Sequence, residues 1–150
     1  MLTLAAKSET LLLNVEIKDM TRECVDKTVA MLGEFGLKER AVIACFDAAT
    51  KSAHPEMRLQ GFPGRYMTNF TEETYGCMFG MGIPVSWGGC TDKQVAADVA
   101  FAKSRGILAW LFCADTPESV YRCIAHGCDN ITGNNPSVAL HIFREMGKHE

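Results

Sequence analysis

The sequence predicts an α/β protein built around a parallel sheet, and three observations lead to that prediction. Short apolar runs of strand length recur along the chain, at 11–17, 41–46, 107–113 and 128–132. Between them lie segments with apolar residues at helical spacing, such as 21–35 and 92–104. The connections are short, with no linker or low-complexity break. Such alternation is typical of parallel strands joined by helical crossovers.

Composition narrows the class of protein further. The chain has 150 residues, a net charge of −3, 47% hydrophobic residues and 22% charged residues, so we expect one globular domain over 1–150. Basic residues do not outnumber acidic ones, so the charge of the chain does not favour nucleic acid as a partner. No apolar run approaches the roughly 20 residues that span a bilayer. The seven cysteines form no Cys-x-x-Cys pair, which favours reduced thiols and a cytoplasmic location.

Local signals place the elements of the first half. Residues 2–9 are predicted to form the tail of a helix that leads into a strand at 11–17. Thr21 opens a helix that ends near Phe35, with Gly36 just beyond it. The next predicted elements are a strand at 41–46, a short helix at 48–53 capped by Asp47, a helical turn around 56–60 and a weak strand near 65–69.

In the second half, Thr71 is a predicted N-cap for a helix at 72–80, and a short strand follows at 83–87. Thr91 and Gln94 have the spacing of a capping box, which predicts a helix at 92–104. Thr116 caps another helix whose first residue is a proline. The remaining predicted elements are strands at 107–113 and 128–132, and helices at 117–125 and 136–146.

Two architectures fit this order of elements. An open, doubly wound sheet of five strands suits 150 residues well. A (β/α)₈ barrel needs eight units and about 250 residues, so this chain would supply part of one. The pattern alone favours the open sheet.

The strand at 11–17 carries the most informative polar residues. Side-chain alternation puts three of them on one face, Asn14, Glu16 and Lys18. A carboxylate and an ammonium facing inward at the end of a buried strand would cost free energy unless they bind a ligand, a metal or each other. Active sites of parallel α/β proteins lie at this end of the strands. A structural ion pair is the alternative interpretation.

Four stretches in order resemble one known family. They are Leu13-Asn-Val-Glu-Ile-Lys18, Val42-Ile-Ala-Cys-Phe-Asp47, the tryptophan-bearing strand Ile107 to Ala114, and Gly127-Cys-Asp-Asn-Ile-Thr-Gly-Asn-Asn-Pro136. Together they resemble the glycerophosphodiester phosphodiesterase family, over about residues 10 to 140. The family fold is a (β/α)₈ barrel, and the resemblance covers about strands 4 to 8. It therefore implies a partial barrel of about five βα units that lacks the family's N-terminal strands.

The resemblance also implies a reaction and a site. The reaction is metal-dependent hydrolysis of a glycerophosphodiester to an alcohol and glycerol 3-phosphate. Glu16 is similar to a ligand of the divalent metal, Mg²⁺ or Ca²⁺, and Lys18 to the catalytic, substrate-binding lysine that faces the phosphate. Phe46 and Trp110 would line the alcohol side as substrate-binding residues, with plain core packing as the alternative. Asp115 and Asn134 also follow strands, and we expect both to cap helices.

The sequence departs from the family in ways that bear on activity. The family's His-Arg-Gly motif, its Glu…Asp metal pair and its second histidine have no match here. None of the four histidines, His54, His126, His141 and His149, is predicted at the C-terminal end of a strand. We therefore expect weak or absent metal binding and no appreciable turnover by this chain alone.

Open sheet edges would follow from a partial barrel. We expect them to be covered by a second copy of the chain or by a complementing N-terminal half. Two other functions stay open at this point. One is a non-catalytic binding or assembly module derived from the same fold, and the other is an open-sheet regulatory domain that binds phosphate at the Gly88-Gly89 turn.

Overall fold

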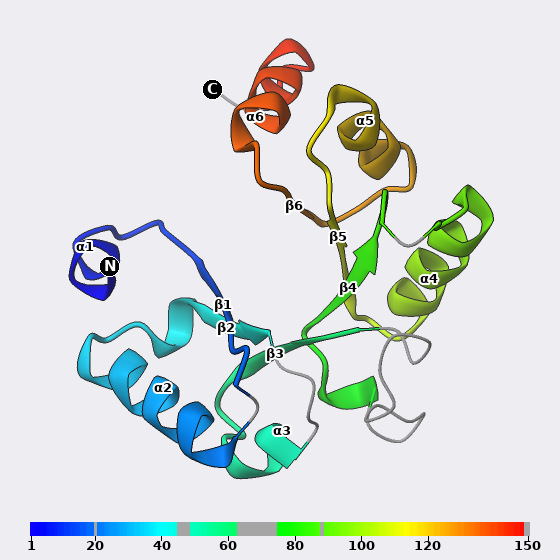
Figure 1. Cartoon of the computed structure of the whole chain (residues 1–150). Coiled ribbons are helices and arrows are strands. Elements are labelled where there is room, and N and C mark those ends of the chain that lie inside the picture. Colours follow the sequence, from blue (N-terminus) through cyan, green and yellow to red (C-terminus); the bar gives the residue numbers. More distant parts are fainter. Residues whose placement is uncertain (20, 45–48, 63–74, 88, 149–150) are drawn as a thin grey trace. The chain divides into compact units, whose positions relative to one another are not determined.

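The structure is a computed structural model that describes residues 1–150 except 20, 45–48, 63–74, 88 and 149–150. The chain divides into two compact units, Met1–Phe79 and Gly80–Glu150 (Figure 1). That residues 1–150 form one domain stays a prediction. Across the described residues, no helix combines the length and the apolar character that crossing a membrane requires.

The first unit holds three parallel strands in chain order. Its elements are α1 (Leu2–Ala6), β1 (Leu13–Glu16), α2 (Arg22–Glu34), the 3-10 helix η1 (Lys38–Arg40), β2 (Ala41–Ala44), α3 (Ala49–Ala53), β3 (Arg58–Gly61) and the 3-10 helix η2 (Tyr75–Cys77). β1 pairs with β2 and β2 with β3. The core lies on the face that carries Ile43 and Leu59, where α2 buries Val25, Val29 and Leu32 against the sheet.

The second unit repeats this plan. Its elements are β4 (Gly80–Pro84), α4 (Asp92–Ser104), β5 (Leu108–Phe112), α5 (Pro117–Ala125), β6 (Asn130–Thr132) and α6 (Pro136–Glu145). β4 pairs with β5 and β5 with β6, all parallel. α4 packs on both β4 and β5, and its Val95, Val99 and Ala102 are buried. The capping box predicted at Thr91 and the N-cap predicted at Thr116 are both confirmed.

The order of the strands decides between the two predicted architectures. In each unit, strands that follow one another in the sequence are also neighbours in space, with a helix or a helical segment between them. A doubly wound sheet instead reverses its strand order at a switch point. The fold is therefore a partial (β/α)₈ TIM barrel, and the prediction of this α/β class is confirmed.

Two local predictions are wrong. Residues 58–61 form strand β3 rather than the end of a helical turn at 56–60, because pairing with β2 buries Leu59 on the core face and Gln60 on the other. The described part of the predicted helix at 72–80 contains only the short η2, and Gly80 already belongs to β4. Glycine at 76 and 80 weakens a helix, and pairing of 80–84 with β5 decides for a strand. The predicted strand at 65–69 and the Asp47 cap lie outside the described residues.

Candidate functional site

The Glu16 and Lys18 side chains meet at the C-terminal end of β1. Exposure alternates along the strand, so that Leu13 and Val15 pack against the core while Asn14 and Glu16 are exposed. Lys18, two residues beyond Glu16, places its Nζ 2.5 Å from the Glu16 Oε1 oxygen. Alternation in a strand therefore brings together the two residues that the sequence singled out.

This ion pair is solvent-exposed. The Lys18 side chain is 81% exposed and that of Glu16 is 46% exposed. The desolvation cost expected for a buried pair is therefore small, and an exposed pair contributes at most about 1 kcal/mol to stability. Both groups are accessible to a ligand from solvent.

An amide pair with one buried member lies on the same face of the first unit. Asn14 Nδ2 donates a hydrogen bond of 3.0 Å to Oε1 of Gln60, whose residue is only 4% exposed. The register aligns Glu16 with Ala44 on β2, and Ala44 with Gln60 on β3. Sequence reasoning missed Gln60 because β3 itself was not predicted. A sequence signal for β3 was present, because Met57, Leu59 and Gly61 recur at every second position around Gln60.

The described residues do not form a divalent metal site by themselves. Mg²⁺ and Ca²⁺ are held by several oxygen ligands. Among the residues that the structure describes, no group of three or more His, Cys, Asp and Glu side chains is placed to hold a metal ion. The one carboxylate predicted as a ligand, Glu16, already accepts a hydrogen bond from Lys18.

Of the two aromatic residues predicted to bind substrate, the structure describes Trp110. Phe46 lies outside the described residues. Trp110 is on β5 of the second unit, 6% exposed, with its ring over Gly80. A Cβ on Gly80 would lie 3.1 Å from the Cδ2 and Cε2 atoms of that ring, so the absence of a side chain there lets the tryptophan lie flat. Its role in binding a substrate stays a prediction.

The described histidines pair with carboxylates of helices. His54 Nε2 lies 2.6 Å from Asp26 Oδ1 on α2, and His126 Nε2 lies 3.0 Å from Asp92 Oδ1 on α4. His141 pairs with Glu145 one turn along α6. His149 lies outside the described residues. None of the three described histidines follows a strand, where acid–base catalysis in this fold class would need it.

The capping role expected for Asp115 and Asn134 is wrong. Thr116 caps α5, and Asn135 is the N-cap residue of α6. Asp115 instead accepts two hydrogen bonds from Asn134, one at Oδ1 from the backbone N–H (2.5 Å) and one at Oδ2 from the side-chain amide (3.2 Å). The pair joins the loop after β5 to the loop after β6.

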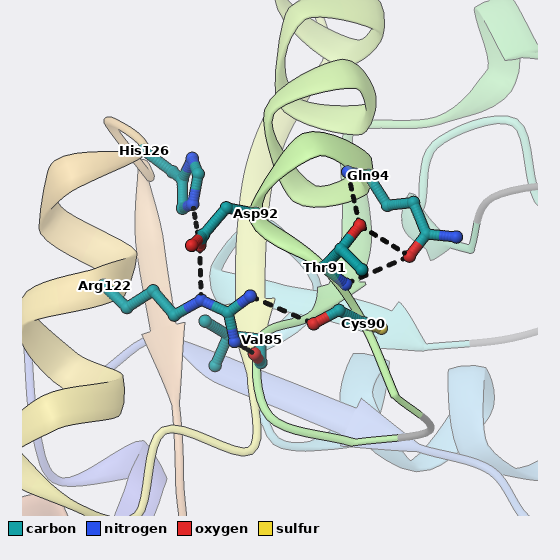
Figure 2. A network of polar contacts seen from close by, with 7 residues as sticks. All are labelled: Val85, Cys90, Thr91, Asp92, Gln94, Arg122 and His126. Carbon is teal, nitrogen blue, oxygen red and sulfur yellow. Dashed lines mark hydrogen bonds and ion pairs between the residues drawn. The ribbon is translucent and has the colours of Figure 1, made fainter.

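A second polar network surrounds Arg122 of α5 (Figure 2). Its guanidinium donates to the Val85 and Cys90 carbonyls and to Asp92 Oδ1, which is 2.6 Å from Nε. Hydrogen bonds from His126 and from Arg122 lower the pKa of the Asp92 carboxyl. The network holds the loop between β4 and α4 against α5.

That loop contains the glycine turn considered for phosphate. Gly88 lies outside the described residues, while Gly89 has a left-handed φ of +71°. Gly89 borders a hollow of about 260 Å³ whose lining also includes Glu118 and Arg122. The Arg122 guanidinium is already bonded to Asp92 and to backbone carbonyls, and the Glu118 carboxylate would repel an anion. The geometry gives this alternative no support.

Comparison with solved structures identifies the fold. A glycerophosphodiester phosphodiesterase from Parabacteroides distasonis has a TM-score of 0.73 and 18% identity, covering 97% of this chain and 63% of that one. The chain has part of the fold of the glycerophosphodiester phosphodiesterases. A Galdieria sulphuraria protein assigned to the same enzyme class has a TM-score of 0.74 and 18% identity, covering 95% of this chain and 61% of that one.

A different class of protein has the same fold. A Bacillus subtilis protein with an EAL domain, crystallised with its substrate c-di-GMP and calcium, has a TM-score of 0.67 and 8% identity. It covers 88% of this chain and 39% of the other. No protein-family model and no curated protein matches the sequence. The chain spans between 51% and 63% of the length of four structures whose names give this activity. The resemblance to the family is therefore confirmed for this part of its fold.

Proposed function

We propose that this chain supplies one wall of a phosphodiester hydrolase site of the glycerophosphodiester phosphodiesterase type. The observation that carries the proposal is the exposed Glu16–Lys18 pair at the C-terminal end of β1, in a fold shared with enzymes named for phosphodiester hydrolysis. A phosphodiester carries one negative charge, which the Lys18 ammonium can neutralise. The substrate class we propose is a glycerophosphodiester.

In this proposal, Lys18 binds the phosphate and Glu16 is one of several ligands to Mg²⁺ or Ca²⁺. The other ligands would come from groups outside the described residues, because the described ones hold no group of three or more such side chains placed to bind a metal ion. Phe46 and Trp110 are proposed to contact the alcohol group. We place the protein in the cytoplasm, since the cysteines at 24, 77, 90, 113, 123 and 128 are all free thiols.

We further propose that the chain alone does not turn over substrate. Hydrolysis in this fold class needs a proton donor and acceptor near the phosphate. The described histidines are bound to carboxylates on helices instead. The same observation favours the second candidate function, a binding or assembly module that keeps the fold without the chemistry.

Two measurements test the proposal. The first follows release of glycerol 3-phosphate from glycerophosphocholine by the isolated chain, with Mg²⁺ or Ca²⁺ present. We expect no turnover above background. Turnover that is lost in Glu16→Gln but kept in Glu23→Gln, an exposed carboxylate on α2, would refute the inactivity of the chain and support the site.

The second measurement is binding of glycerophosphocholine, followed by titration calorimetry or by ³¹P NMR. We expect weak binding that Lys18→Gln abolishes and Lys27→Gln retains. Lys27 is a matched control because it is also exposed and also bonds a glutamate, at 2.6 Å. Equal binding by both variants would refute the phosphate role of Lys18, and binding without turnover would favour the non-catalytic module.

A further inference from the structure

In both units, a helix that follows a strand also covers the next strand. α2 follows β1, and its buried Val25 and Val29 share one core cluster with Ile17, at the end of β1, and with Ile43 of β2. α4 follows β4 and packs on both β4 and β5. This arrangement is the ordinary consequence of a right-handed crossover between parallel strands.

The last helix lacks that next strand within the second unit. α6 follows β6 and packs on α5, and Ile142 is its one buried residue. Leu140 is 37% exposed, and together with Phe143 it lines a hollow of about 760 Å³ between α6 and β6. Ile131 of β6 is only half-buried, whereas Leu111, its partner on β5, is fully buried.

The hollow, called the slot below, is lined by residues of α5, β6 and α6, so a further parallel strand could pack there. Among the described residues of the second unit, β6 pairs with β5 alone, so its other edge offers backbone N–H and C=O groups. The incoming strand would need apolar side chains on the face toward α6. Most of the slot's lining consists of apolar atoms from residues such as Ile124, Ala139 and Phe143, which suits such a strand.

We propose that a second copy of this chain fills the slot with its β1. Where the structure describes the first unit, β1 pairs with β2 alone. Its core-facing Leu13 and Val15 are only half-buried, and Leu11, just before the strand, is 45% exposed. Pairing β1 of one copy beside β6 of the other places these apolar side chains beneath Leu140 and Phe143. The polar residues of β1 then stay on the opposite face.

This interface joins two different surfaces, which we call the α6 slot (Ile131, Leu140 and Phe143) and the β1 edge (Leu11, Leu13 and Val15). Such heterologous contacts either close into a ring or continue as an open chain. Each copy buries apolar side chains that the isolated chain leaves partly exposed to water, which is the driving force for association. The inference is independent of the proposed hydrolase site.

The test uses the whole chain in sedimentation velocity between about 1 and 100 μM. Leu140→Glu adds a charge to the α6 slot, and Leu11→Glu adds one to the β1 edge. Met31→Glu is the control, because Met31 is a 48% exposed apolar residue of α2 outside both surfaces. Far-UV circular dichroism establishes that each variant is folded.

We expect the wild type and Met31→Glu to self-associate. Each of the other two variants alone should weaken association at least tenfold. A mixture of the two should recover it, because one copy keeps an intact slot and the other an intact edge. A wild-type chain that stays monomeric at 100 μM would overturn the proposal. So would association that resists both variants, that only one of them weakens, or that the mixture does not restore.

Discussion

Replacement of Arg122 by alanine tests whether the network in Figure 2 stabilises the second unit. The guanidinium bonds the Val85 and Cys90 carbonyls as well as Asp92, and its side chain is only 25% exposed. A hydrogen bond from a charged donor contributes about 1.5–3 kcal/mol when its partner is sheltered, and little when it is exposed. The Asp92 side chain is 72% exposed, so the hydrogen bonds to the two carbonyls contribute most of the stabilisation.

We therefore expect Arg122→Ala to lower the free energy of unfolding by about 2–4 kcal/mol. Urea unfolding followed by tryptophan fluorescence measures this in the right place, because Trp87 and Trp110 both belong to the second unit. Arg122→Lys keeps the charge but loses the three-way geometry of the guanidinium, and should recover less than half of the loss.

Arg144→Ala is the control, since it removes the same residue type from an exposed position on α6. Its effect should stay within about 0.5 kcal/mol. If Arg122→Ala were as mild as this control, the bonds to Val85 and Cys90 would not hold the loop, and the reasoning would be refuted.

Three further predictions concern other positions. Gly133→Ala should destabilise the chain by about 1–3 kcal/mol, because its Cβ would lie 2.6 Å from the Ala114 carbonyl oxygen. Gly76→Ala should not destabilise the chain, because a Cβ there would meet no atom within 4 Å. Equal denaturation midpoints for the two variants would contradict this prediction. The pKa of Asp92 is lowered in the folded state, so its contribution to stability is present above the unfolded value near 3.8 and is lost as pH falls through the folded value. Asp92→Asn should therefore flatten the acid limb of a stability–pH curve, and an unchanged limb would contradict the assignment. Burial raises the pKa of the Cys123 thiol to about 12, so peptide mapping after iodoacetamide treatment at pH 8 should find it unmodified unless urea is present.

Predictions from the sequence succeeded where a few adjacent residues decide the outcome. Thr21, Thr91 and Thr116 accept hydrogen bonds from backbone N–H groups three residues on, so their sequence spacing is enough to place three helix starts. Glu16 and Lys18 meet because they are two residues apart in an extended chain.

Predictions failed where a distant partner decides. Arg58-Leu-Gln-Gly61 is a strand because β2 lies beside it, and the alternation of four residues is too short to specify that pairing. Asp115 and Asn134 both have the local character of capping residues, but they bond to each other across 19 positions in the sequence. The space that the Trp110 ring occupies likewise depends on Gly80, a residue 30 positions earlier.

The sequence by itself determined the alternation of strands and helices, most helix starts and the polar face of β1, because each depends on hydrogen bonds and side-chain directions within one or two turns. The tertiary structure alone decided the order of the strands, the burial of Gln60 beside Asn14, and the pairing of His54 and His126 with carboxylates of α2 and α4. Those features arise when apolar faces pack together and bring residues far apart in the chain within hydrogen-bonding distance.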